Sequence, residues 1–273
     1  MPTFFLVLIF STAFACELVQ AEEPPAGEEA ASAEANADKH ELEELGVNRY
    51  TAPSIAQIFK QLDELKPLPF DQLKREAPQV SGASREQKGL MFGELIADGF
   101  LLVEAERKNL IENFGRVLMQ HARGLGVGDR VMRHSASLTD LGRRGEWPRM
   151  RQELITTQSD VEAAMMELRD EKMAQLISLG GWLRGLEISA ATVELDFSPQ
   201  HAQMLAQPDL ANYFANELNT LPPALARTPL FEKIRGGIKT LEPLLNKGKL
   251  SRSEVSAIRV EAAQLNNFIR QAQ

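Results

Sequence analysis

Residues 84–103 read SREQKGLMFGELIADGFLLV, and this stretch decides the fold of the chain. Ser84 and Gln87 lie three residues apart, the capping-box pattern that opens a helix. The fourteen residues from Leu90 to Val103 then contain only two polar side chains, both carboxylates. A bilayer span needs about 20 apolar residues and excludes such charges. The stretch therefore predicts a central, buried helix of a helical bundle.

Small residues recur every four positions along this helix, at Gly89, Gly93 and Ala97. Residues four apart share one face of a helix. We therefore expect a smooth face on which a second helix approaches closely.

The remainder of the chain repeats helical patterns and lacks the alternating Val, Ile, Thr and Tyr of strands. Aromatic residues make up only 6% of the 273 residues, which also disfavours a β-rich fold. We predict an all-α, multi-helix bundle with roughly eight or nine helices. The expected helices cover 51–65, 71–77, 84–103, 110–123, 130–143 and 147–197, then begin again near Pro199, Pro208, Pro229 and Ser251.

The expected helix 147–197 is too long to be uninterrupted, because helices usually run for 8 to 20 residues. Gly180 and Gly181 predict a bend or an interruption. Arg169-Asp170 offers a second place for a break.

The N-terminus carries an export signal in Phe4–Phe10, FFLVLIF. Its apolar run suits the 7 to 15 residues of a signal-peptide core better than a membrane span. Two small-residue cleavage patterns follow, one ending at Ala15 and one at Ala21. Ala13-Phe14-Ala15-Cys16 resembles a lipobox, which implies lipidation of Cys16, the single cysteine of the chain. The signal peptide is accordingly 1–21, or 1–15 in a lipoprotein.

Residues 22–47 form an acidic segment with nine acidic side chains against one basic side chain. It contains too few apolar groups to offset its ordering entropy, so we predict a disordered linker. This segment accounts for the formal net charge of −8, and the body is close to neutral. The helical bundle is expected over 48–273, with a possible subdivision near 198.

Glu94 and Asp98 are candidate functional residues because they lie four apart on the central helix. A carboxylate pair inside a bundle can bind a metal or hold a proton. The other interpretation is that the pair marks the solvent edge of a buried helix or meets arginines from neighbouring helices. We expect no metal and no cofactor, since the Glu-x-x-His pairs of di-metal bundles do not occur.

Trp182, Arg184 and Glu187 lie beside the Gly180-Gly181 pair and are the second group of candidates. If the bundle contains a ligand cleft, we expect these side chains to line it together with Glu94 and Asp98.

Arginines are concentrated in residues 107–151, a segment with ten basic and four acidic side chains. The next segment, 153–219, holds three basic against eleven acidic side chains. Pairing between these helices is one interpretation. The other is an exposed face for an anionic partner, made by Arg116, Arg123, Arg130, Arg133, Arg143 and Arg144.

The usual catalytic motifs, G-x-S-x-G, H-E-x-x-H, Walker A and C-x-x-C, do not occur in the chain. We therefore expect an exported, non-enzymatic protein of the bacterial cell envelope, periplasmic or at the outer surface, that binds or supports a partner. An envelope protein or an anionic surface is the expected partner; nucleic acid is not, and the membrane is met only through a lipid anchor or surface contact. The alternative is a small-ligand-binding protein or an enzyme with its site near Glu94, Asp98 and Trp182.

Overall fold

The computed structural model describes residues 60, 62–78, 81–168 and 170–271, which belong to one compact unit. Within these residues the regular structure is helical and no strand occurs, which confirms the all-α prediction. The predictions on the signal peptide, on Cys16, on the acidic linker and on the first residues of the bundle lie outside the described residues.

Eight of the described α-helices are at least twelve residues long, close to the number predicted. In chain order the elements are α3 (Phe70–Leu73), α4 (Arg85–Glu104), the 3-10 helix η1 (Lys108–Leu110), α5 (Ile111–Gly124), α6 (Gly128–Arg144), α7 (Trp147–Glu167), α8 (Glu171–Leu195), α9 (Pro199–Gln203), α10 (Pro208–Asn219), α11 (Pro223–Ala226), α12 (Pro229–Leu245) and α13 (Arg252–Gln271).

Side-chain caps fix where the long helices begin. The Gln87 backbone N–H donates to Ser84 Oγ at the start of α4, over 3.1 Å. At the start of α13, the Ser251 backbone N–H donates to Glu254 Oε2, and the Glu254 backbone N–H donates to Ser251 Oγ. This reciprocal pair satisfies two backbone donors that no helical carbonyl reaches.

The break in the expected helix 147–197 falls at its second predicted position, between the end of α7 and the start of α8. Of the bend or interruption predicted at Gly180 and Gly181, the interruption is wrong, because α8 continues through both glycines. These glycines make room for α4: a Cβ atom on Gly180 would lie 2.0 Å from the carbonyl oxygen of Leu90.

The short helix expected at 71–77 ends already at Leu73. The Leu73 carbonyl accepts a hydrogen bond from Arg184 rather than from a following turn. The next residue, Lys74, has extended backbone angles. The extended segment carries Arg75 toward α4.

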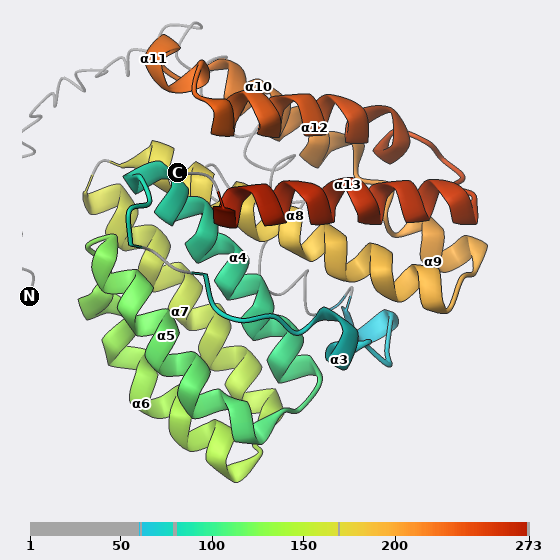
Figure 1. Cartoon of the computed structure of the whole chain (residues 1–273). Helices are drawn as coiled ribbons and strands as arrows, with labels where there is room; N and C mark the ends of the chain where they lie inside the picture. The colour runs from blue at the N-terminus through green and yellow to red at the C-terminus, as the bar shows by residue number, and fades with distance from the viewer. Residues whose placement is uncertain (1–59, 61, 79–80, 169, 272–273) are drawn as a thin grey trace, which may run out of the picture. The chain divides into compact units, whose positions relative to one another are not determined.

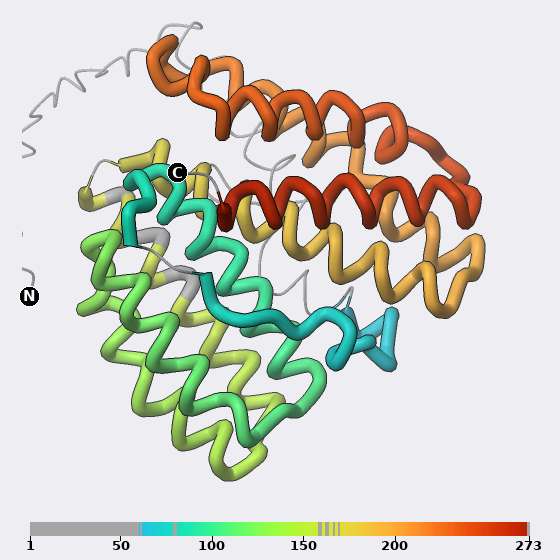
Figure 2. The backbone as a smooth tube through the Cα atoms, viewed as in Figure 1, coloured from blue at the N-terminus to red at the C-terminus, as the bar shows by residue number. Residues whose placement is uncertain are grey.

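Helices α4 and α8 pack along each other at the centre of the described unit (Figure 1). Helices α5, α6 and α7 follow one another in a layer beside α4, whereas α13 packs on α8 and α12 packs on α13 (Figure 2). None of the described helices combines the length and the apolar character that crossing a membrane requires.

The hydrophobic core differs between these two sides. On the side of α13, one continuous cluster joins α8 with α10, α12 and α13, so helices before and after Ser198 share it. On the side of α5 to α7 the core is divided into two clusters. One contains Phe100, Leu138 and Met150, and the other contains Phe92 and Leu118.

Candidate functional site

The predicted carboxylate pair of α4 meets one arginine that sequence reasoning had not selected. Arg75 donates from Nη2 to Glu94 Oε2 over 2.9 Å and from Nε to Asp98 Oδ2 over 2.8 Å. The Glu94 side chain is completely buried, whereas 17% of the Asp98 side chain is exposed. The arginine fork is well suited to bridging two carboxylates in this way.

Arg184 of α8 is the second cation of this group, and it is 1% exposed. It donates from Nε to Asp98 Oδ1 over 2.7 Å, and its Nη1 lies 2.7 Å from Glu187 Oε2. Its Nη2 donates to the Leu73 carbonyl. A single side chain thus links α8 to α4 and to the end of α3.

The C-terminal helix completes the arrangement. Asn266 of α13 donates from Nδ2 to Glu187 Oε2 over 2.7 Å and to the Leu183 carbonyl over 3.2 Å. We call Arg75, Glu94, Asp98, Arg184, Glu187 and Asn266 the charge cluster. It ties four parts of the chain together: the segment after α3, and helices α4, α8 and α13.

Burial governs the protonation of the charge cluster. Desolvation raises the pKa of Glu94 to about 8, against the attraction of Arg75, and the charge of Asp98 acts in the same direction as burial. Desolvation lowers the pKa of Arg184, but Asp98 and Glu187 outweigh it, so that the net pKa of Arg184 is raised. Glu94 therefore retains a proton near neutral pH, while Arg184 stays charged.

Most of the carboxyl oxygens in the charge cluster accept hydrogen bonds from its arginines. Both oxygens of Asp98 and one oxygen of Glu94 accept bonds from arginines. Glu94 Oε1 and Asn266 Oδ1 are the buried oxygens of the cluster that have no hydrogen-bond partner among the described residues. The cluster residues do not contribute to the lining of the two cavities that flank α4. The bonds of the cluster orient the helices that carry it.

Trp182 does not join the other four predicted cleft residues. It stacks on Phe214 with ring centroids 4.9 Å apart, and its Nε1 donates to Gln207 Oε1 over 3.0 Å. Successive helical residues are rotated by about 100°, so Trp182 and Arg184 leave α8 on different faces. Trp182 lines a cavity of about 20 Å³, which is room for about one water molecule.

The predicted arginine face lies on α5 and α6, where most of the arginines are paired with acids. Arg116 bonds to Asn113 on its own helix, and Arg123 forms no ion pair with the described residues. The other four pair as follows: Arg130 with Glu167, Arg133 with Asp160, Arg143 with Glu112, and Arg144 with Asp140 and Glu146.

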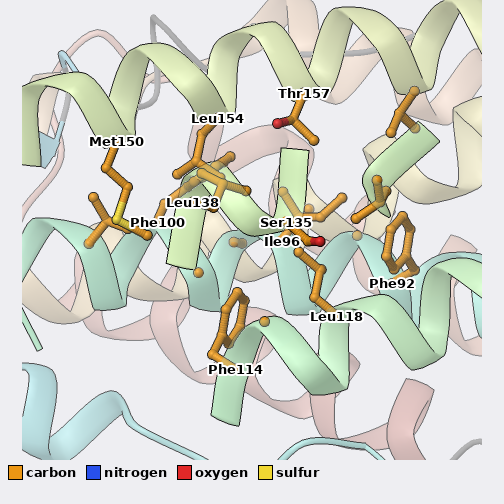
Figure 3. Close-up of a pocket in the computed structure, with 18 of the residues that line it drawn as sticks. Phe92, Ile96, Phe100, Phe114, Leu118, Ser135, Leu138, Met150, Leu154 and Thr157 are labelled. Atoms are coloured by element: carbon orange, nitrogen blue, oxygen red, sulfur yellow. The ribbon is translucent and has the colours of Figure 1, made fainter. Parts of the chain in front are cut away.

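A larger cavity, of about 140 Å³, lies between α4, α8 and the layer of α5 to α7. Side chains of α7 point across it toward α4 and α5 (Figure 3). It is lined by Phe92, Gly93, Ile96, Ala97, Gly99, Phe100, Val103, Ile111, Phe114, Gly115, Leu118, Val131, Ser135, Leu138, Thr139, Met150, Leu154, Thr157, Val161, Ile177, Ser178 and Gly181.

Three of the four hydroxyl side chains in this lining donate to backbone carbonyls. Ser135 Oγ donates to the Met132 carbonyl, Thr139 Oγ1 to the Ser135 carbonyl, and Thr157 Oγ1 to the Glu153 carbonyl. A water molecule needs two to four polar partners to occupy a cavity. The lining thus offers a largely apolar environment.

An ionic contact closes the seam between α6 and α7 beside this cavity. His134 Nδ1 lies 2.9 Å from Glu153 Oε1, and His134 Nε2 lies 3.1 Å from Asp160 Oδ2. Partial burial lowers the pKa of His134, but the bonds to both carboxylates outweigh it, and the net pKa is raised. Ser135, which follows His134, and Thr157, which lies between Glu153 and Asp160 in the sequence, both line the cavity.

Sequence reasoning did not identify this cavity. The available signal is the placement of small residues, Gly115, Ser135 and Thr139, among the large apolar ones of α5 and α6. Small residues leave space only if no neighbouring side chain fills it, and that depends on how the helices are placed.

Comparison with protein families, with curated proteins and with solved structures finds no match for this chain.

Proposed function

We propose that this chain is an exported helical-bundle protein of the bacterial cell envelope that acts by binding a small apolar molecule rather than by catalysis. The signal Phe4–Phe10 and the acidic segment after it support export. The observation that carries the binding function is the apolar cavity of about 140 Å³.

The cavity is costly to the fold. Apolar walls that face no neighbouring atoms lose the dispersion contacts that a filled core makes. Larger side chains at Gly115 or Ser135 would fill this space. We expect a core that binds no ligand to be filled in this way. A bound apolar molecule would recover the lost contacts.

The chemistry of the two candidate regions favours binding over catalysis. In the charge cluster, arginines occupy Asp98 completely and Glu94 on one oxygen. In the cavity, the hydroxyls of Ser135 and Thr157 bond to backbone carbonyls and are not poised as nucleophiles.

Export is tested by intact mass and membrane fractionation of the protein from its native cells, alongside a Cys16→Ala variant. A mature mass that begins at Cys16 with added lipid, lost together with membrane association in the variant, would establish a tethered envelope protein. A soluble protein that begins at Glu22 would support export and exclude the lipid anchor at Cys16. An unprocessed chain in the cytoplasm would overturn export.

Binding is tested by thermal unfolding of the purified chain with benzene, cyclohexane and n-hexane. A ligand that binds only the folded state raises the midpoint temperature. Ser135→Leu fills the cavity and should remove the effect. Ala136→Leu places the same side chain on the exposed face of α6 and should preserve it. If no hydrocarbon changes the midpoint of the native chain, the binding function is refuted.

A further inference from the structure

We infer that the cavity is shaped for a single unbranched alkyl chain that lies along α4. This inference rests on the proposed binding function and names the class of ligand for that site.

The cavity is elongated along the helix axes. Helix α4 lines it from Phe92 to Val103, and α7 lines it from Met150 to Val161. The first and last residues of each stretch are eleven positions apart, which corresponds to about 16 Å along a helix axis. Figure 3 shows the same extension, with Phe100 and Met150 toward one end, Ile96 between, and Phe92 at the other end.

The division of the core supports this shape. Phe100 and Met150 of one cluster and Phe92 and Leu118 of the other line the one cavity. Ile96 and Phe114 also line it and pack against both clusters. The cavity therefore extends past Ile96 and Phe114 from one cluster to the other, and an occupant that touched both clusters would be long and apolar.

The volume then sets the width. A space of about 140 Å³ holds a hydrocarbon of about six carbons, as cavities of about 150 Å³ hold benzene. Spread along several turns of helix, this volume leaves a narrow slot rather than a round chamber. A chain of about six to eight carbons can lie in such a slot, whereas a ring of equal carbon number must widen it.

The walls provide contact without directed polar bonds. Ile96, Phe114 and Leu154 are only partly buried although they lie inside the helical layers. Gly115 leaves the wall open, since a Cβ atom there would meet nothing closer than Thr139 Oγ1 at 3.9 Å. Recognition by such walls depends on shape and on apolar area, which is what an alkyl chain presents.

The test compares hydrocarbons of equal carbon number on the purified chain: n-hexane, cyclohexane and benzene. We expect n-hexane to bind at least tenfold more tightly than cyclohexane, and to shift the methyl NMR signals of Ile96 and Leu118. Ser135→Leu should abolish these shifts, and Ala136→Leu should leave them unchanged.

The outcomes separate this inference from the function on which it rests. Equal or tighter binding of cyclohexane or benzene would overturn the linear shape and leave the apolar binding function standing. Absence of binding by all three would overturn both. Loss of all binding in Ala136→Leu would also count against the site, because that residue does not line the cavity.

The alkyl chain can be free or belong to a lipid, and two further probes distinguish these sources. Octanoate in solution presents a free chain, and phosphatidylethanolamine vesicles present chains within a membrane. Methyl shifts with octanoate alone assign the site to a free acid. The same shifts with vesicles assign it to a lipid chain. If n-hexane binds but neither octanoate nor the vesicles shift the methyl signals, both sources are excluded. The site then does not bind the alkyl chain of a fatty acid or a lipid.

Discussion

Gly93 of α4 lies directly against Gly181 of α8: a Cβ atom on Gly93 would come within 2.7 Å of the Gly181 backbone nitrogen. The same Cβ atom would lie 1.8 Å from the carbonyl oxygen of Ile177. Both neighbours are backbone atoms of a long helix, so no side-chain rotation can relieve the contact. The central helix pair therefore depends on glycine at this position.

Gly93→Ala should destabilise the protein by about 3 kcal/mol or more, because the helices must move apart to accept the methyl group. Urea unfolding followed by circular dichroism measures the change. Gly185→Ala on α8 is the matched control, since a Cβ atom there meets nothing within 4 Å. The control should be neutral or more stable by up to about 1 kcal/mol. Equal stability of both variants would contradict the close crossing.

The crossing shows how far the sequence determines the fold. The spacing of Gly89 and Gly93 predicts a close helix partner, and the caps at Ser84 and Ser251 predict where helices begin. The partner itself is set by long-range packing. For that reason the pair Gly180 and Gly181 suggested a helix break, although the two glycines accommodate α4. From the sequence alone, a glycine pair indicates a weak point in a helix. Once the partner helix is known, the same pair indicates close packing.

Arg184→Ala should destabilise the protein by about 3 to 5 kcal/mol, because it removes the buried cation shared by Asp98 and Glu187. Asp98 then keeps only its pair with Arg75, and Glu187 keeps no ion pair among the described residues. Arg144→Ala on exposed α6 removes pairs with Asp140 and Glu146, which are worth at most about 1 kcal/mol. Chemical denaturation of both variants at pH 7 gives the comparison. If the loss for Arg184→Ala is as small as that for Arg144→Ala, the charge cluster does not hold the helices together.

Glu94→Gln should change how stability depends on pH. Burial raises the pKa of Glu94 from 4.5 to about 8 in the folded state, so the folded protein binds this proton more tightly than the unfolded chain does. The resulting stabilisation is complete below pH 4.5 and is lost as the pH rises through 8. Glutamine resembles the protonated acid and does not titrate. The variant should gain stability relative to the native chain between pH 5 and pH 9, measured by urea unfolding. A constant difference over this range would contradict the raised pKa.

The candidate site residues, like the glycines, could be predicted from the sequence only where they lie close together on one helix. Helical spacing predicts that Glu94 and Asp98 share one face of α4, and Arg75 bridges the two carboxylates there. Arg75 could not be selected, because it reaches α4 from an extended segment whose path no local pattern records. The cavity is still further from prediction, because it is defined by the space between five helices.

Gly115→Ala should stabilise the protein by about 1 kcal/mol. Alanine favours the helix over glycine by about that amount, and its methyl group would enter the cavity with its nearest neighbour 3.9 Å away. Gly142→Ala on α6 is the contrasting variant, because its Cβ atom would lie 2.6 Å from Ile111 Cγ2. Thermal unfolding should show a higher midpoint for the first variant and a lower midpoint for the second. A loss of stability in Gly115→Ala would contradict the open space beside α5.

His134→Ala should weaken the α6–α7 seam mainly in acid. Bonds to Glu153 and Asp160 raise the pKa of His134 above 6.5 in the folded state, despite partial burial. The stabilisation is therefore complete below pH 6.5 and is lost as the pH rises through the folded-state pKa. We expect the variant to lose about 1 kcal/mol at pH 5.5 and less at pH 9, measured by urea unfolding. His201→Ala is the control, because that ring bonds to Asp196 at the end of α8 and lies outside the α6–α7 seam. A loss for His134→Ala that is as large at pH 9 as at pH 5.5 would show that the ring acts by packing, and that the charged contact does not close the seam.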